Sequence, residues 1–254
     1  MKHTILSAAC AGLLIAISAT AQAAAISGQG TWESTLQGRD LDGNLATFEA
    51  YYDSVLDITW FANANYAATS GYDGDGHLLW NQAVAWADQL NINGYDQWRL
   101  PSVAPVNGVS FNYKVFSYDG SGDIGFNITS PNSEMAHMFY VTLGNPSEYS
   151  PTGVAGQCFA SVDNCLDNTG PFANLLPGVY WSGTEYTLNT TAAFYFGMHM
   201  GWQTVTSKGN GFLAWAVSDG DVGVAPAVVP LPAAVWLFGS GLLGLLGVSA
   251  KRRG

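Results

Sequence analysis

The sequence predicts an α+β fold for one domain that spans residues 26–228 of the 254-residue chain. Two segments carry apolar residues at helical spacing, and both precede most of the predicted strands. Runs of β-branched and aromatic residues separated by turn residues dominate the last third of this region. Helices that precede antiparallel strands are typical of α+β proteins. No linker-like run and no internal repeat divides the region, which favours a single domain.

The first predicted helix lies in the sequence LLWNQAVAWADQLNING. Trp80, Val84, Ala87 and Leu90 recur at steps of four, three and three, so they share one face of a helix. The Asn-Gly pair at the end of this sequence provides a stop signal. We expect the apolar face to belong to the core.

The second predicted helix lies in ITSPNSEMAHMFYVTLGN. Ser130 and Pro131 have the residue types of an N-cap and a first helical turn. Gly144 provides the end of the helix. Its apolar face consists of Met135, Met138, Phe139 and Leu143.

Strands are predicted where β-branched and aromatic residues lie between turns. The predicted strands cover residues 49–61, 179–186, 192–207 and 212–218. The Lys-Gly-Asn-Gly sequence of residues 208–211 predicts a hairpin between the last two. Residues 144–178 are predicted to be mostly loop, and a ligand is expected first in this long loop.

The N-terminus has the layout of a signal peptide covering residues 1–23. Lys2 and His3 precede an apolar run from Ile5 to Ile17, and small residues follow as far as Ala23. We therefore expect signal peptidase to cleave after Ala23 and the rest of the chain to be exported.

Residues 233–250 predict a transmembrane helix. These 18 residues contain no charged side chain and would extend over about 27 Å as a helix, enough to cross a hydrocarbon layer. Lys251, Arg252 and Arg253 follow directly, which places the C-terminus in the cytoplasm and the domain outside.

The exported region is strongly acidic. Without its two ends the chain retains four basic residues and all nineteen acidic residues, a formal net charge of −15. Such a surface repels phosphate backbones, so nucleic acid is not an expected partner. Two cysteines remain, Cys158 and Cys165, and an even pair in an exported protein predicts a disulfide.

A series of motifs in residues 49–222 resembles the Lcl C-terminal-like domain family. The resemblance implies a C-type-lectin-like fold, with two short helices packed on a small twisted antiparallel sheet and a long loop region. Its motifs include Asp57-Ile58-Thr59-Trp60, Trp80-Asn81-Gln82-Ala83, Trp98-Arg99-Leu100-Pro101-Ser102, Tyr180-Trp181-Ser182-Gly183-Thr184-Glu185 and Ala214-Trp215-Ala216-Val217.

We expect structural roles for the motif residues. The tryptophans, Trp98, Trp181 and Trp215 among them, are large enough to form much of the core, with nearby Asp and Asn side chains as partners for their N–H groups. Arg99, beside Leu100 and Pro101, is expected to pair with a carboxylate or with loop carbonyls. Ser218 departs from the family pattern, in which an arginine usually follows Ala-Trp-Ala-Val, and this weakens the transfer of any ligand site built there.

The segment before the predicted membrane helix resembles the VPLPA variety of the PEP-CTERM sorting signal, which covers residues 229–254 here. Its motif is Val229, Pro230, Leu231, Pro232 and Ala233. The resemblance implies that an exosortase removes the helix. The protein would then pass from the inner membrane to the cell surface or extracellular matrix of a Gram-negative bacterium.

From the sequence we do not expect this protein to be an enzyme. WRLP also resembles a segment of formylglycine-generating and related oxygenase-like domains, but those need reactive cysteines or an iron site. The only two exported cysteines lie close enough to bridge each other, and no histidine pair has metal-ligand spacing. We expect a noncatalytic surface or matrix module that binds polysaccharide; an enzyme and a purely structural surface protein are the alternatives.

Calcium is the one inorganic ligand that the sequence suggests. Asp73 and Asp75, and likewise Asp119 and Asp123, alternate with glycines, so their carboxylates could turn toward a cation. Neither segment completes an EF-hand, and acidic turns in water are the alternative interpretation. No other cofactor is expected.

Overall fold

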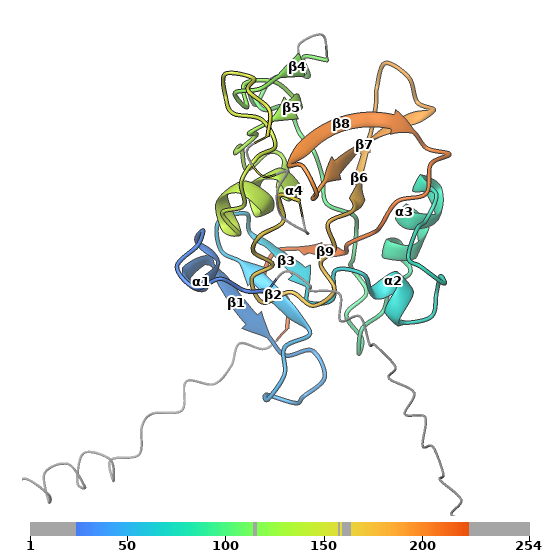
Figure 1. Ribbon diagram of the computed structural model, residues 1–254. Helices are drawn as coiled ribbons and strands as arrows, with labels where there is room; N and C mark the ends of the chain where they lie inside the picture. Colours follow the sequence, from blue (N-terminus) through green and yellow to red (C-terminus); the bar gives the residue numbers. More distant parts are fainter. Residues whose placement is uncertain (1–23, 114–115, 157, 159–163, 224–254) are drawn as a thin grey trace, which may run out of the picture.

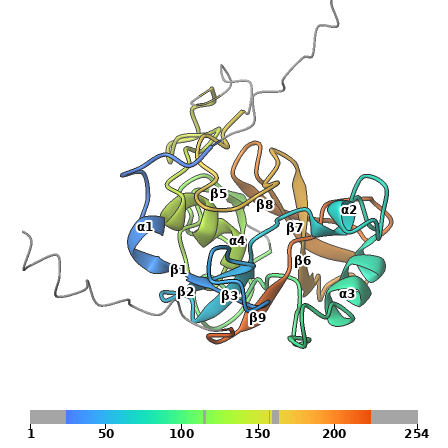
Figure 2. The ribbon, with the colours of Figure 1, turned by 90° about the horizontal axis from the view of Figure 1, so that it is seen from below.

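The computed structural model describes residues 24–113, 116–156, 158 and 164–223. Within them the chain has a mixed α/β structure in which a few short helices lie against two sheets. Figures 1 and 2 show α2 and α3 on one side of the molecule and α1 and α4 on the other. In this part of the chain, no helix has the length and apolar character needed to cross a bilayer. The predicted signal peptide, sorting motif, membrane helix and basic tail lie outside the described residues.

The first sheet is antiparallel and has the strand order β1-β2-β3-β9. Its strands are β1 (Leu36–Arg39), β2 (Ala50–Asp53), β3 (Ile58–Phe61) and β9 (Val217–Asp219). The single strand predicted over residues 49–61 is therefore wrong, because this segment is a hairpin. The Asp53 carboxylate accepts the N–H groups of Val55 and Leu56, and Asp57 has a φ of 54°, so the chain turns there.

The second sheet has the order β4-β5-β8-β7-β6, and only its β4-β5 pair is parallel. Its strands are β4 (Phe116–Ser117), β5 (Ile124–Phe126), β6 (Val179–Glu185), β7 (Ala192–Gly197) and β8 (Trp202–Ser207). The strand predicted over residues 192–207 is a second hairpin, in which Gly201 adopts a φ of 77°. The described residues thus form two sheets where one small antiparallel sheet was predicted.

The hairpin predicted around residues 208–211 does not form. Phe212 bridges to Leu78 and Leu213 bridges to Tyr180, while β9 joins the first sheet by pairing with β3. The chain therefore crosses from the second sheet to the first after residue 211. Local turn chemistry favoured the hairpin, but the buried side chains of residues 213–217 decide the pairing partner instead.

Both predicted helices are confirmed. The first is α3 (Trp80–Asp88). The second is α4 (Glu134–His137), which continues into the π-helical turn η1 (Met138–Thr142). This helix begins later than predicted because the N–H of Ser133 donates to the carbonyl of Ser130, so the expected cap lies in a preceding turn.

Two helices of one turn each were not predicted from the sequence. They are α1 (Trp32–Thr35) and α2 (Tyr66–Thr69). Four residues are too few for a recognisable apolar repeat, and only Ala67 among them is buried. Tertiary contacts, rather than a local pattern, therefore determine these short turns.

Central segments of the chain send alternate side chains into two separate hydrophobic cores. Trp215 lies in the first core and its neighbour Ala216 in the second. Tyr180 and Trp181 divide in the same way between the two cores. Successive side chains of an extended strand point to opposite faces, so these segments are buried on both sides. Each fully buried tryptophan removes roughly 200 Å² from water, worth about 5 kcal/mol before entropy is counted.

Backbone carbonyls accept the indole N–H groups of the motif tryptophans Trp98, Trp181 and Trp215. This corrects the expectation that Asp and Asn side chains would be the partners. The bonds run from Trp98 to Tyr95, from Trp181 to Leu78 and from Trp215 to Phe61, at 2.8–2.9 Å. The indoles therefore connect loops and strands as well as filling space.

The described parts of residues 144–178 contain no helix or strand, as predicted. Asn168, which is fully buried, replaces regular pairing there: its Oδ1 accepts the N–H of Ile26 and its Nδ2 donates to the carbonyl of Leu143. The predicted disulfide between Cys158 and Cys165 is confirmed in this loop, and both cysteines are buried.

Replacing Cys158 and Cys165 together by alanine is expected to lower the free energy of unfolding by about 2–3 kcal/mol. The disulfide closes a short loop, and its removal gives the unfolded chain more conformational freedom. Urea unfolding followed by tryptophan fluorescence measures the change, and reduction of the unaltered protein should give a similar shift. Equal midpoints for the two proteins would show that the bond adds no stability.

Candidate functional site

A groove of about 600 Å³ lies between α3, the Trp98–Ser102 segment and β6. It is distinct from the long loop in which the sequence placed a ligand. Its polar lining residues are Asn81, Asp88, Arg99, Ser102 and Thr184, and its apolar ones include Val84, Trp98 and Leu100. Hydrogen-bonding groups at the margins and apolar surface between them are typical of small-molecule and carbohydrate sites.

One face of α3 forms one wall of the groove. Asn81, Val84, Ala85 and Asp88 lie at i, i+3, i+4 and i+7, so they share one face of α3 and line the groove. The opposite face carries the buried residues of this helix, Ala83, Trp86 and Ala87. Core packing therefore orients this wall of the groove and leaves the side chains of Asn81 and Asp88 exposed.

The floor of the groove is the WRLP segment, which is held from two sides. The backbone groups of Arg99 and Val217 exchange two hydrogen bonds of 2.8 Å, which attaches the floor to β9. The N–H of Gly183 in β6 donates to the carbonyl of Pro101 at 2.8 Å. Both sheets thus contribute to the position of this segment.

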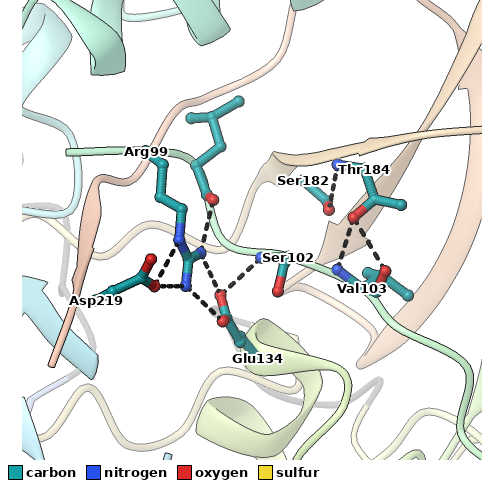
Figure 3. A network of polar contacts seen from close by, with 8 residues as sticks. Arg99, Ser102, Val103, Glu134, Ser182, Thr184 and Asp219 are labelled. Atoms are coloured by element: carbon teal, nitrogen blue, oxygen red, sulfur yellow. Dashed lines mark hydrogen bonds and ion pairs between the residues drawn. The ribbon is translucent and has the colours of Figure 1, made fainter. Parts of the chain in front are cut away.

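The Arg99 side chain links three elements beneath the groove (Figure 3). Its two terminal nitrogens donate to the two carboxylate oxygens of Glu134 at 2.8 Å, a bidentate pair. The same guanidinium contacts Asp219 Oδ1 at 2.9 and 2.5 Å. Burial by itself lowers the pKa of Arg99, but Glu134 and Asp219 outweigh it, so its pKa is raised and it stays charged.

Glu134 also fixes the edge of the groove. Its Oε2 accepts the backbone N–H of Ser102 at 2.6 Å, so the Arg99 pair and the groove margin share one carboxylate. The Thr184 hydroxyl accepts the N–H of Val103 at 2.8 Å and donates to its carbonyl at 3.0 Å (Figure 3). The polar margin is therefore part of a rigid hydrogen-bond network, which suits binding by fixed complementarity.

The aspartates predicted to bind calcium form two separate acidic turns. Asp73 Oδ1 accepts the N–H groups of residues 75 and 76, and Asp75 Oδ1 accepts that of His77. Asp119 Oδ1 accepts the N–H and hydroxyl of Ser121. These contacts lower the pKa of Asp75 and Asp119 through hydrogen bonds to the ionised forms.

Asp123 differs from the other three because it is buried, at 2% exposure. Its two oxygens accept the N–H groups of Val106 and Asn112 at 2.7 and 2.5 Å, so this carboxylate holds the loop that precedes β4. Calcium at the four aspartates stays a prediction.

Sequence reasoning missed a second group of carboxylates that could hold a metal ion. Oxygen atoms of Asp40, Asp42 and Glu49 lie within 4.8 Å of one another. The signal that could have found it is the sequence Asp-Leu-Asp-Gly-Asn with a glutamate five residues later. Asp40 is buried and already accepts the N–H groups of residues 42 and 43, so its turn is preformed.

Replacing Glu134 by glutamine is expected to lower the free energy of unfolding by about 1–2 kcal/mol. The change removes a partly buried charge from the bidentate pair, although Asp219 still faces Arg99 and the guanidinium is one third exposed. Asp219→Asn is the matched control: the side chain of Asp219 is 80% exposed, so we expect a loss below about 1 kcal/mol. Denaturant unfolding of the two variants would refute this ranking if Asp219→Asn proved the more damaging.

Comparison with known proteins places these residues in a family. The model of the Lcl C-terminal domain matches residues 49–218, about two thirds of the chain, and the match includes α3, the WRLP floor, Glu134 and β6. No curated protein and no solved structure matches the chain. By the extent of the family match, the chain belongs to the Lcl C-terminal domain family.

Proposed function

We propose that this protein is exported to the cell surface or extracellular matrix, where its lectin-like domain binds polysaccharide without catalysis. The observation that carries the proposal is the groove beside α3. It is open, and it presents an amide, a carboxylate and hydroxyl groups from Asn81, Asp88 and Ser102 around an apolar floor. Sugars offer hydroxyl groups and C–H faces that such a surface can match.

The rigidity of the groove supports binding rather than turnover. The ion pairs of Arg99 and the Thr184 bonds hold the floor and margin from below. None of the residues that line the groove is a cysteine or a histidine. The cysteine pair that an oxygenase-like enzyme would need is a disulfide. A noncatalytic module therefore accounts for the arrangement better than an enzyme does.

Export and sorting follow from the two ends of the chain. A signal peptide over residues 1–23 directs the chain to signal peptidase, and the VPLPA motif at residues 229–233 makes it an exosortase substrate. The apolar helix over residues 233–250, with its basic tail, anchors the precursor in the inner membrane until processing.

Removing two groove side chains is expected to weaken polysaccharide binding at least tenfold. Asn81 and Asp88 are exposed on α3, so the double variant Asn81→Ala, Asp88→Ala loses hydrogen bonds to sugar hydroxyls and leaves the core unchanged. The measurement is cosedimentation of the mature protein, isolated from its host, with the exopolysaccharide of that host.

Gln89→Ala provides the control, because Gln89 is also exposed but lies outside the groove. We expect binding within twofold of the unaltered protein. If the unaltered protein does not bind the exopolysaccharide, the function is structural and the proposal fails. If binding occurs and the double variant retains it, the groove is not the site.

Replacing both Pro230 and Pro232 by alanine is expected to leave an unprocessed precursor in the membrane fraction. The prolines keep the backbone extended before the apolar helix, where a protease can reach it. Intact-mass analysis of membrane and released fractions determines whether residues 233–254 are present. Pro226→Ala, three residues upstream of the motif, is the control and should be processed normally; equal processing of all three chains would refute exosortase sorting.

A further inference from the structure

A second pocket, of about 310 Å³, lies where β4, β5 and β8 meet the long loop. It shares no residue with the groove beside α3. Aromatic residues form most of its lining, together with Met200 and one acidic residue, Glu148. The aromatic residues are Phe116, Tyr118, Phe126, Tyr149 and Trp202.

The rings of this pocket form one connected group around Phe126. Phe126 is buried, and its ring centroid lies 4.7 Å from that of Tyr149 and 6.0 Å from that of Tyr118. Trp202 stacks beside Phe126 at 6.2 Å. Phe116 and Tyr118 are 45% and 38% exposed, unusually high for aromatic side chains. A group of rings that is packed at its base and open at its rim can stack on a ligand.

Glu148 is a buried acidic residue whose carboxylate has few hydrogen-bonding or charged partners. Its residue is only 3% exposed, and its Oε1 accepts one long bond of 3.3 Å from the N–H of Gly156. Among the described residues, no arginine, lysine or histidine forms an ion pair with it. A buried carboxylate without a cation is costly, so a cation that enters the pocket gains by pairing with it.

Among the described residues, the other arginine and lysine side chains are paired elsewhere. Arg39, Arg99 and Lys208 pair with Asp221, with Glu134 and Asp219, and with Glu185, respectively. Lys114, the fourth basic residue of the exported region, lies outside the described residues. With a net charge of −15, the exported region attracts cationic ligands and repels uronic-acid or sulfated polymers.

We propose that the aromatic pocket binds the protonated amine of an amino-sugar unit in a deacetylated, cationic polysaccharide. The ammonium group donates to the Glu148 carboxylate and lies against the electron-rich ring faces. The C–H face of the sugar ring stacks on Tyr118 or Tyr149. This inference rests on the proposed polysaccharide function and names the chemical class of the polymer.

Two other ligands fit the pocket less well. A neutral sugar needs donors and acceptors around each of its hydroxyls, whereas the pocket offers mainly ring faces, with two tyrosine hydroxyls and one acidic residue. A quaternary ammonium ion suits the ring faces but has no N–H to donate to Glu148. A primary ammonium on a stackable ring uses both features at once.

The test is calorimetric titration of the mature protein with three probes: a glucosamine tetramer, its N-acetylated counterpart and tetramethylammonium chloride. At a pH where the amine is protonated, we expect the glucosamine tetramer to bind at least tenfold more tightly than either of the others. Its affinity should fall as rising pH removes the amine proton and as added salt screens the charges. Equal binding of the N-acetylated tetramer would overturn the inference, and tighter binding of tetramethylammonium would assign the pocket to quaternary ammonium ions instead.

Paired variants locate the binding. Glu148→Gln removes the charge and keeps an acceptor for Gly156, and we expect at least a tenfold loss of affinity. Tyr118→Leu removes an exposed ring, and a similar loss is expected. The controls change the same residue types elsewhere: Glu33→Gln, which alters net charge equally, and Tyr72→Leu, a tyrosine 55% exposed. Controls that lose as much affinity as the pocket variants would overturn the proposal.

The same proteins are tested against the host exopolysaccharide, which separates this inference from the proposed function. If the exopolysaccharide binds but the glucosamine tetramer does not, only the amino-sugar inference fails. If neither binds, both fail. Thermal unfolding of each variant identifies loss of folding, and Tyr118→Leu keeps the test decisive if Glu148→Gln does not fold.

Discussion

The structure depends on burial of its central segments on both faces. Trp60 and Trp215 pack with ring centroids 4.5 Å apart in the first core, and Phe61 and Ala216, which follow them in the chain, belong to the second. Because neighbouring side chains point in opposite directions, neither core can be repacked without moving the other. Only 11% of the residues of the chain are charged, and the largest fully buried side chains of the described residues include Trp60, Trp181 and Trp215.

Arg99 connects the buried central segments to the surface of the groove. Its backbone pairs with β9, whereas its side chain reaches Glu134 at the start of α4. Glu134 in turn receives the N–H of Ser102 at the groove margin. One charged residue thus joins a sheet, a helix and a candidate binding surface, and the family match includes Arg99, Ser102 and Glu134.

Local patterns predicted α3, the loop character of residues 144–178 and the disulfide. They also indicated that Arg99 pairs with a carboxylate or with loop carbonyls, but among nineteen acids nothing in the sequence singles out Glu134 and Asp219. The sheet partner of β9 was mispredicted because pairing depends on buried contacts far away in sequence. The groove and the aromatic pocket were missed for the same reason, since their walls come from segments that only the tertiary fold brings together.

The position of the disulfide links the aromatic pocket to the redox state of Cys158 and Cys165. A carboxylate oxygen of Glu148 lies within 4.8 Å of both cysteine sulfurs, so the disulfide lies next to this residue of the pocket. Disulfides form in oxidising compartments, whereas cysteine thiols stay reduced in the cytoplasm. If the protein is exported as proposed, a chain that has not yet crossed the membrane lacks the disulfide beside Glu148. The proposed ligand binding at the pocket would then be acquired only after export, away from the sugars of the cytoplasm.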